Sequence, residues 1–370
     1  MGKSPMDRVV SQWSDSLPQP LEQQAREALK RKLKSYTIYG TMLLLPAGTM
    51  ECLEQNHVMR HNHDDLFDRV AEVLQVTHIA VNNPIPPEKA DRDSQNVIRS
   101  PINFQPVHGD FGPSQCRWPP SQEEFGEAYW TTAKQNGIWQ TWAPRWTMFS
   151  RGNISEKARL LELDSVRTAV QQGELDGRGC AAVDLYAGIG YFTFSYLKAG
   201  VSKVLCWDLN PWSIEGLTRG AKSNKWKAVT YQADVDLEDM VKRDSRLLVF
   251  EESNERATER LKAMRPYLSP IRHVNCGLLP TSKGSWETAF LVIDPELGGW
   301  VHVHENFEQS SIKRLAESVR QQFQHMLENA TTSGLCGNVA LEGIHEVKTY
   351  APGVWHVVLD IYVPPHPAPS

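Results

Sequence analysis

One stretch of the chain, residues 181–212, limits the possible folds more than any other. It contains a short apolar run that ends at Asp184, a turn with Gly188 and Gly190, an amphipathic segment, and a second β-rich run that ends at Asp208. Strand, glycine turn, helix, strand and acid is the order of a nucleotide-binding βαβ unit. The glycines let the backbone approach a ligand closely, and the second acid can accept hydrogen bonds from both hydroxyls of a ribose. The stretch therefore predicts a nucleotide site.

The glycine spacing indicates which nucleotide. Only Gly188-Ile189-Gly190 is present, so the dinucleotide pattern G-x-G-x-x-G is incomplete. D-x-x-A-G-x-G after one strand, with an acid after the next, instead fits the S-adenosylmethionine (SAM) version of the fold. The alternative is a glycine turn in an unrelated α/β protein. In the SAM interpretation, the cofactor contacts expected from this stretch are Asp184, Tyr186, Ala187, Gly188, Gly190, Asp208 and Asn210.

At 370 residues, the chain is long enough for two or three domains. The segment after residue 150 holds the βαβ unit, and the segment before it reads as short strands and helices rich in turn residues. We expect an α/β fold: a class I SAM-dependent methyltransferase-like Rossmann domain with a smaller N-terminal α+β domain. The expected boundaries are a flexible tail at 1–20, an N-terminal α+β domain with possible RNA contact at 21–150, a SAM-binding catalytic domain at 151–363 and a disordered tail at 364–370.

Bulk properties exclude several classes of protein. No apolar run approaches the ~18 residues of a membrane span, and the N-terminal residues lack the apolar core of a secretory signal. The six cysteines are scattered and include no CxxC pair, which argues against a zinc site or a disulfide framework and favours a reducing compartment, by default the cytoplasm.

The formal net charge of −5 gives no support for binding to a long nucleic acid, although local patches could still bind one. A helical pattern over 21–36 places Arg26, Lys30, Arg31 and Lys34 on one face. This face could meet phosphates, as the tryptophan-rich residues 139–146 could meet bases, but a solvated helix surface is the simpler interpretation.

A second polar cluster precedes the βαβ unit. Ser150-Arg151-Gly152-Asn153 comes just before a helix expected from about Ser155 to Gln172, and Lys157 lies in its first turn. Such a turn can present amide groups and side-chain donors to a carboxylate or a phosphate. The alternative is a plain turn in which Asn153 or Ser155 caps the helix.

Further strands follow the βαβ unit. Residues 228–232 are the expected third strand, after which an acid normally reaches the adenine amino group in this fold. Residues 300–306, WVHVHEN, alternate as a half-exposed strand should, with His302 and His304 on one face. A metal site there lacks a convincing third ligand, so two histidines at a polar sheet end are the better interpretation. Residues 343–349 and 355–363 pair as a hairpin.

Five motifs together resemble one family of tRNA-modifying SAM enzymes, which contains the tRNA guanine N1-methyltransferases and the wybutosine-synthesising transferases. DLYAGIGYF (184–192) and DLNP (208–211) are similar to the paired motifs of the whole family. Three further stretches favour the wybutosine branch: MFSRGNISEK (148–157), HVNCGLLPTS (273–282) and GGWVHVHEN (298–306). The resemblance is close from about residue 137 to 363 and looser over 37–113.

The resemblance implies transfer of the 3-amino-3-carboxypropyl group of SAM, not its methyl group, to a ring carbon of the tricyclic 4-demethylwyosine base beside the anticodon of tRNA(Phe). Methylthioadenosine is the by-product. Carried over to this chain, Ser150 and Lys157 lie at the amino-acid end of SAM, Asp208 holds the ribose, and Asp234 and Val235 frame the adenine. The other expected cofactor contacts are Arg151, Asn153 and Asn275.

Two departures keep alternatives open. The N-P-P-Y or D-P-P-Y motif of exocyclic amine methylation does not occur, which argues against that reaction. Its nearest counterparts, Asn275-Cys-Gly-Leu-Leu-Pro280 and Asp294-Pro295, lack the aromatic residue. Ring-nitrogen methylation of guanosine remains an alternative, as does a SAM- or RNA-binding module without catalysis. The sequence Asp234-Val-Asp-Leu-Glu-Asp239 also replaces the usual Asp-Asn-Arg of the adenine strand, which leaves the adenine contact open.

Overall fold

The computed structural model describes residues 4–82, 101, 104–231, 236–330 and 337–366. The chain forms two compact units: unit 1 comprises Met1–Ala133 and Thr141–Phe149, and unit 2 comprises Lys134–Gln140 and Ser150–Ser370. The division crosses the hairpin of β5 (Thr131–Gln135) and β6 (Ile138–Trp142). The expected division at residue 150 therefore omits the tip of this hairpin from the second unit.

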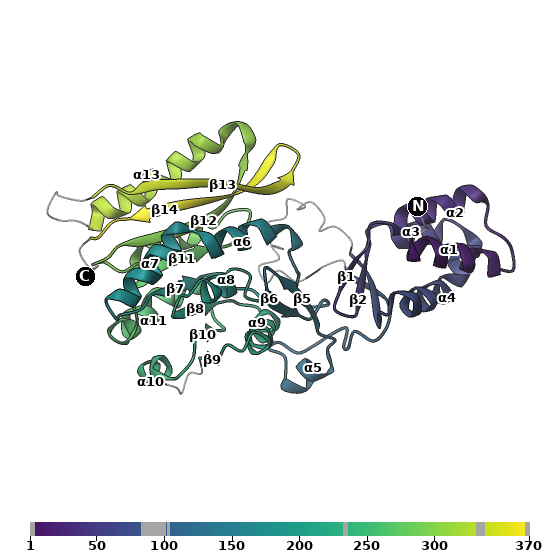
Figure 1. The fold of residues 1–370 in the computed structure, drawn as a ribbon, viewed down its shortest axis with the longest axis horizontal. Helices are drawn as coiled ribbons and strands as arrows, with labels where there is room; N and C mark the ends of the chain where they lie inside the picture. The colour runs from purple at the N-terminus through teal and green to yellow at the C-terminus, as the bar shows by residue number, and fades with distance from the viewer. Residues whose placement is uncertain (1–3, 83–100, 102–103, 232–235, 331–336, 367–370) are drawn as a thin grey trace. The chain divides into compact units, whose positions relative to one another are not determined.

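Unit 1 contains a four-stranded mixed sheet and helices that pack on it (Figure 1). The strand order is β1-β2-β3-β4, in which β2 and β3 are parallel and the outer pairs are antiparallel. Its strands are β1 (Thr37–Tyr39), β2 (Met42–Pro46), β3 (His78–Asn82) and β4 (Phe104–His108), and its helices are α1 (Pro5–Ser16), α2 (Gln23–Leu33), α3 (Thr49–Glu54), α4 (His57–Leu74) and α5 (Gln122–Glu127).

Helix α1 overturns the prediction of a flexible tail over residues 1–20. The Ser4 hydroxyl accepts a hydrogen bond from the Asp7 N–H at 3.1 Å and caps the helix. Met6, Val9, Val10 and Trp13 follow at helical spacing and are buried in the core of unit 1. The prolines at 18 and 20 end this helix instead of marking a frayed terminus.

Unit 2 is built on an eight-stranded sheet with the order β13-β14-β12-β11-β7-β8-β10-β9. The six strands from β9 to β12 along this order are parallel, and the β13–β14 hairpin closes one edge antiparallel to β12. This arrangement confirms the Rossmann-like class and the expected C-terminal hairpin. The strands are β7 (Ala181–Asp184), β8 (Lys203–Trp207), β9 (Ala228–Thr230), β10 (Leu247–Phe250), β11 (Ile271–Cys276), β12 (Gly299–Glu308), β13 (Ala340–Ala351) and β14 (Val354–Val363).

Helices cover both faces of this sheet, and the alternation of β7 shows why. Ala182 packs into the core cluster shared with the first helix group, whereas Ala181 and Val183 pack into the cluster shared with the second group. The first group is α6 (Ile154–Glu162), α7 (Asp164–Leu175), α8 (Thr193–Lys198) and α9 (Pro211–Ser223), and the second is α10 (Leu237–Lys242), α11 (Ala257–Met264), α12 (Trp286–Val292) and α13 (Ile312–Ala330). Short 3₁₀ turns are η1 (Arg151–Asn153), η2 (Asn254–Arg256), η3 (Arg265–Tyr267), η4 (Lys283–Ser285) and η5 (Gln309–Ser311).

Three local predictions for unit 2 are wrong. The single helix expected over 155–172 is two helices, because Leu163 is extended (φ −65°, ψ 123°) between α6 and α7. Strand β12 is buried from Gly299 to Glu305 instead of half-exposed, since it lies between β11 and β14 with both faces covered. Within the expected disordered tail, His366 donates its N–H to the Pro295 carbonyl at 2.8 Å; residues 367–370 lie outside the described residues.

Among the described residues, no helix is both long enough and apolar enough to cross a membrane.

Candidate functional site

The glycine turn joins β7 to α8 in a conformation that requires glycine. Gly188 (φ 53°) and Gly190 (φ 87°) both lie in the left-handed region, and a Cβ on Gly190 would come within 2.6 Å of the Phe194 ring. The Ala187 N–H donates to the Trp207 carbonyl at 2.9 Å, which ties the turn to the end of β8. The Ala187 methyl is buried in the core, so only its backbone can face a ligand.

Asp184 connects three elements through hydrogen bonds. It is fully buried, and its carboxylate accepts hydrogen bonds from the Asn275 amide at 2.9 Å and from the N–H and hydroxyl of Thr193 at 3.1 and 2.7 Å. Burial raises the pKa of this carboxyl although the hydrogen bonds favour its ionised form. Both oxygens are engaged within the protein, so Asp184 orients the turn between β7, β11 and α8.

Asp208, at the carboxyl end of β8, faces the same turn. Its carboxylate accepts hydrogen bonds from the N–H groups of Gly188 at 2.8 Å and Asn210 at 2.9 Å. Burial raises the pKa of Asp208 to about 6, and the two N–H donors oppose that shift. The side chain of Asn210 caps α9 by accepting from the Trp212 N–H at 3.0 Å. Asp208 is therefore held in place with a second lone pair left on each oxygen for ribose hydroxyls.

Tyr186 closes the other side of the turn. Its hydroxyl hydrogen-bonds with the side chains of Ser285 and Asn254, and burial raises its pKa. Asn254 also donates to the Leu185 carbonyl at 2.8 Å. The tyrosine is thus fixed by loops that follow β10 and β11 in the chain.

The acid that follows the strand beside β8 is not the one that the sequence predicted for the adenine contact. Asp234 and Val235 lie outside the described residues. Strand β9, which precedes them, is at the sheet edge, and β10 is inserted between it and β8. The acid that follows the neighbour of β8 is therefore Glu251, whose charge raises the pKa of Asp208 and whose own pKa burial raises. The sequence pointed to the acid after β9 instead of Glu251, because β9 follows β8 in the chain whereas β10 lies beside β8 in the sheet.

The Ser150–Asn153 turn meets a lysine that sequence analysis missed. Lys348 of β13 donates from Nζ to the Ser150 hydroxyl at 3.2 Å, and a Cβ on Gly152 would come within 2.8 Å of the same Nζ. The Ser150 N–H donates to the Tyr191 hydroxyl at 3.4 Å. Burial lowers the pKa of Lys348. A turn before β7 and a strand near the end of the chain thus form one site.

Lys157 supplies a second ammonium to this site, and this one is buried. It is 3% exposed, and its Nζ donates to the amide oxygens of Gln135 and Gln140, at 2.8 Å for the latter, and lies 5.7 Å from the centre of the Tyr191 ring. Burial, and next the positive charge of Lys348, lower its pKa to about 8. The surroundings are electropositive and sheltered from water, as an anion-binding site requires.

Two side-chain amide oxygens are the remaining polar groups that we consider for this site. Asn153 begins α6 without a side-chain cap, and its Oδ1 is buried with no hydrogen-bond partner among the described residues. The Oδ1 of Asn275, at the end of β11, is likewise buried without a hydrogen-bond partner among the described residues. Asn153 thus occupies the N-cap position without a capping hydrogen bond from its side chain, and Ser155 lies within the helix. Both amide oxygens can accept from a cationic group. Arg151 is exposed in η1.

Four site residues had little sequence signal: Gln135, Gln140, Tyr191 and Lys348. Tyr191 directly follows the glycine turn and could have been included from its spacing. The other three are ordinary polar residues on strands, and only the folded arrangement brings them beside Lys157.

The two predicted RNA-binding features are only partly exposed. On α2, Arg26 pairs with Asp15 and Lys30 with Glu27, whereas Arg31 and Lys34 are exposed. Trp142 is 2% exposed and stacks on Phe149, so its ring is not available to a base.

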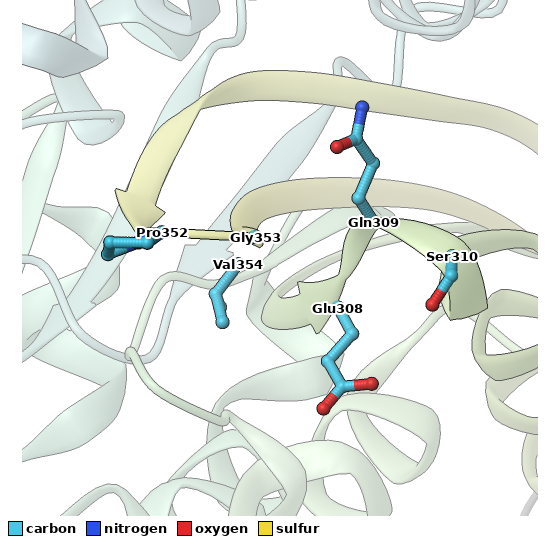
Figure 2. Close-up of a pocket in the computed structure, with 6 residues that line it drawn as sticks. All are labelled: Glu308, Gln309, Ser310, Pro352, Gly353 and Val354. Atoms are coloured by element: carbon cyan, nitrogen blue, oxygen red, sulfur yellow. The ribbon is translucent and has the colours of Figure 1, made fainter.

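Two other places do not provide a ligand site. No group of three or more His, Cys, Asp or Glu side chains among the described residues has an arrangement suited to a metal ion. A concave region at the β13–β14 turn is lined by Glu308, Gln309, Ser310, Pro352, Gly353 and Val354 (Figure 2). It contains none of the residues described above, and its one charged side chain is a carboxylate, which does not suit an anion.

Comparison with known proteins agrees with this geometry. Residues 131–264 match the model of the TRM5/TYW2 methyltransferase domain. The tRNA wybutosine-synthesizing protein 2 of Schizosaccharomyces pombe is 40% identical over 296 residues, which cover 80% of this chain and 63% of that protein. Residues 131–264 of this chain therefore form a TRM5/TYW2 methyltransferase domain. The protein of the same name from Saccharomyces cerevisiae is 35% identical and covers 78% of this chain and 60% of its own length. The chain thus spans about six tenths of these relatives.

Solved structures share the fold of this chain. Pyrococcus horikoshii TYW2 in complex with MeSAdo superposes with a TM-score of 0.60 at 18% identity and covers 97% of this chain and 99% of that one. The complex of aTrm5 and tRNALeu gives a TM-score of 0.54 at 15% identity, with 98% and 79% covered.

Removal of the Asp184 carboxylate tests whether its hydrogen bonds hold β7, β11 and α8 together. Asp184→Ala leaves Thr193 and Asn275 without their buried acceptor, so we expect the free energy of unfolding to fall by about 3 kcal/mol. Urea denaturation measures the change. Asp164→Ala, at a side chain 98% exposed, is the matched control and should stay within about 0.5 kcal/mol of wild type. Equal stability of Asp184→Ala and wild type would contradict the role.

Proposed function

We propose that this chain transfers the 3-amino-3-carboxypropyl group of SAM to a ring carbon of the 4-demethylwyosine base beside the anticodon of tRNA(Phe), with release of methylthioadenosine. The observation that carries the proposal is the meeting of two lysines, the buried Lys157 and the half-buried Lys348, with Ser150 beside the glycine turn. The names of the curated relatives and the MeSAdo in the TYW2 complex support it.

The nucleoside end of SAM fits the glycine turn. Asp208 would accept from the ribose hydroxyls, because its two oxygens are oriented by Gly188 and Asn210 and keep a free lone pair each. Glu251, after the strand beside β8, is the acid that we assign to the adenine edge in place of Asp234. Burial raises the pKa values of both carboxyls. Asp208 is half-buried, which partly shields its hydrogen bonds from water, whereas Glu251 is exposed.

The methionine arm of SAM is a zwitterion, and the second half of the site offers partners for both charges. Lys157, Lys348 and the Ser150 hydroxyl would bind the carboxylate. The unpartnered oxygens of Asn153 and Asn275 would accept from the ammonium. A ligand that lacks the arm would leave these buried groups without partners.

Position decides the outcome of this chemistry. When bound, SAM supplies a sulfonium with three electrophilic carbons, and alignment with the nucleophile selects the one that reacts. Most residues of the arm site lie on α6, at η1 and on β13, apart from the glycine turn that holds the nucleoside. Asn275, at the end of β11, is the arm residue that adjoins this turn, through Asp184. A firm hold on the arm is therefore the feature that this chain adds to an ordinary SAM site.

The substrate and compartment complete the proposal. A tRNA partner follows from the family, and Arg31 and Lys34 are exposed cations that can meet its phosphates. The buried thiols Cys180, Cys206 and Cys276 form no disulfides, which suits the reducing cytoplasm.

Product identity tests the proposed reaction. The protein is incubated with tRNA(Phe) that carries 4-demethylwyosine and with SAM labelled separately on the methyl and the carboxyl carbon. We expect carboxyl label in the tRNA and methyl label in methylthioadenosine. Methyl label in the tRNA would establish methyl transfer, including N1-methylation of guanosine when unmodified tRNA is the acceptor. SAM binding without transfer of either label, to the tRNA that carries 4-demethylwyosine or to unmodified tRNA, would establish a binding module.

The pH dependence of binding tests the two halves of the site separately. Asp208 is ionised above its pKa of about 6, so the affinities for SAM and for methylthioadenosine should both fall as the pH drops through 6. Lys157 is charged below its pKa of about 8, so the affinity for SAM should fall as the pH rises above 8. Methylthioadenosine has no carboxylate and should show no such fall.

Titration calorimetry from pH 5 to 9.5 measures both affinities. The control is Lys157→Gln, which should bind SAM more weakly at pH 7 and show a smaller alkaline decrease, since Lys348 still titrates. An alkaline decrease as large in Lys157→Gln as in wild type would come from Lys348 or from the ligand's own amino group, and would contradict the assignment of Lys157.

A further inference from the structure

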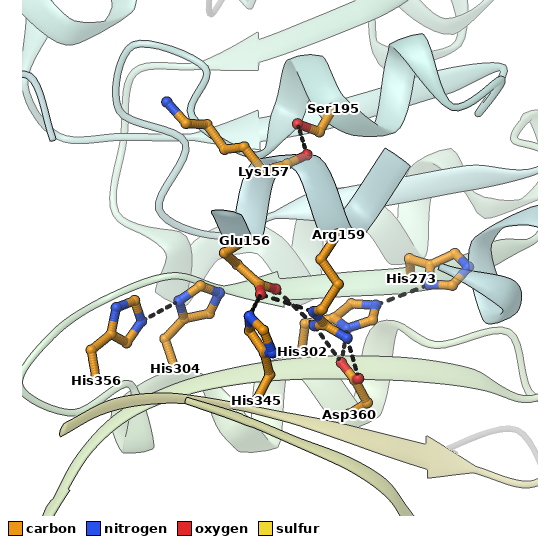
Figure 3. A network of polar contacts seen from close by, with 10 residues as sticks. All are labelled: Glu156, Lys157, Arg159, Ser195, His273, His302, His304, His345, His356 and Asp360. Carbon is orange, nitrogen blue, oxygen red and sulfur yellow. Dashed lines mark hydrogen bonds and ion pairs between the residues drawn. The ribbon is translucent and has the colours of Figure 1, made fainter. Parts of the chain in front are cut away.

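A buried ion network lies on α6 beside Lys157 and uses none of the residues that we assign to SAM. Arg159 donates to both oxygens of Glu156, at 2.8 and 2.7 Å, and to both oxygens of Asp360 on β14, at 2.6 and 3.1 Å. Glu156 is 1% exposed and Asp360 is 6% exposed. Arg159 thus joins α6 to a strand 201 residues away in the chain through bidentate contacts (Figure 3).

The network continues into the sheet through histidines. His302 lies 2.7 Å from Asp360 through Nδ1 and 3.1 Å from His273 Nδ1 through Nε2. Burial alone would raise the pKa of Asp360, but His302 and Arg159 outweigh it and hold that pKa well below its usual range. Glu156 also meets His345 of β13 at 3.4 Å. The contacts therefore span α6, β11, β12, β13 and β14.

A gain in folding stability does not by itself explain why the chain contains this buried ion network. Buried ion pairs rarely stabilise a protein more than well-packed apolar side chains of the same volume, because desolvation offsets their attraction. Directional contacts do fix the relative position of the elements that they join. Here they join α6, which carries Lys157, to the hairpin that carries Lys348.

The arrangement on α6 separates the network from the site. Glu156 and Arg159 are three residues apart and lie on one side of the helix, while Lys157 extends the other way (Figure 3). The Ser195 hydroxyl donates to the Lys157 carbonyl at 3.1 Å and ties this part of α6 to α8. Any rotation or shift of α6 would therefore move the Lys157 ammonium away from Lys348 and Ser150.

We propose that Arg159 and Asp360 are positioning residues, which set the distance between Lys157 and Lys348 and so keep the hold on the methionine arm of SAM. The inference rests on the proposed function, since it assumes that these lysines bind the arm. Neither residue touches the ligand in this account. Their effect is confined to the arm half of the site, because the network has no contact in the described residues with the glycine turn or Asp208.

Two ligands that share the methylthioadenosine part, and differ in the arm and in the sulfonium charge that goes with it, test this inference. The affinities of Asp360→Asn and Arg159→Lys for SAM and for methylthioadenosine are measured by titration calorimetry at pH 7. We expect the affinity for SAM to fall about tenfold in Asp360→Asn and less in Arg159→Lys, which keeps the charge but loses the bidentate geometry. The affinity for methylthioadenosine should change less than twofold in both.

The controls separate the possible failures. Arg320→Lys changes a similar bidentate clamp, with Glu317 on α13, and should leave both affinities unchanged. Unchanged affinity for SAM in both variants, or an equal loss for both ligands, would overturn the positioning role. If Asp360→Asn does not fold, Arg159→Lys decides the question alone. A wild-type protein that does not bind SAM would instead overturn the proposed function.

Discussion

A lysine ammonium buried next to a second one is the constraint on which the rest of the site depends. The pKa of Lys157 is lowered from 10.5 to about 8, which corresponds to a cost on the order of 3 kcal/mol for keeping it charged in the ligand-free fold. By linkage this penalty is present below pH 8 and disappears as the pH rises toward the ordinary lysine pKa. Gln135, Gln140 and the Tyr191 ring reduce it but add no negative charge of their own. An anionic ligand would offset it.

The two halves of the proposed SAM site have different structural origins. The nucleoside half depends on local geometry: two left-handed glycines, the buried Asp184 tie and an acid at the end of the next strand. The arm half depends on elements distant in the chain, since η1 and α6 precede the parallel sheet and β13 follows it. A SAM enzyme can therefore keep the first half and change which group it transfers through the second.

This division also explains what could be predicted from the sequence. The strand limits around the glycine turn, the position of Asp208 at the end of β8 and the C-terminal hairpin follow from motif spacing and residue periodicity, which are local information. Lys348 could not be found in this way, because its contact with Ser150 joins residues 198 positions apart. Glu251 was missed because insertion of β10 beside β8 is a matter of sheet topology. The histidines of β12 alternate as in a half-exposed strand, and only the partners Asp360 and His356 show that a buried polar layer covers that face.

A crystal structure of the chain with bound SAM tests the central claim most directly. We predict that the ribose hydroxyls lie at Asp208 and that the methionine carboxylate lies within hydrogen-bond distance of the ammonium groups of Lys157 and Lys348. A ribose at Asp208 with the carboxylate directed away from both lysines would contradict the account, because the arm site would then have no part in choosing the carbon that reacts.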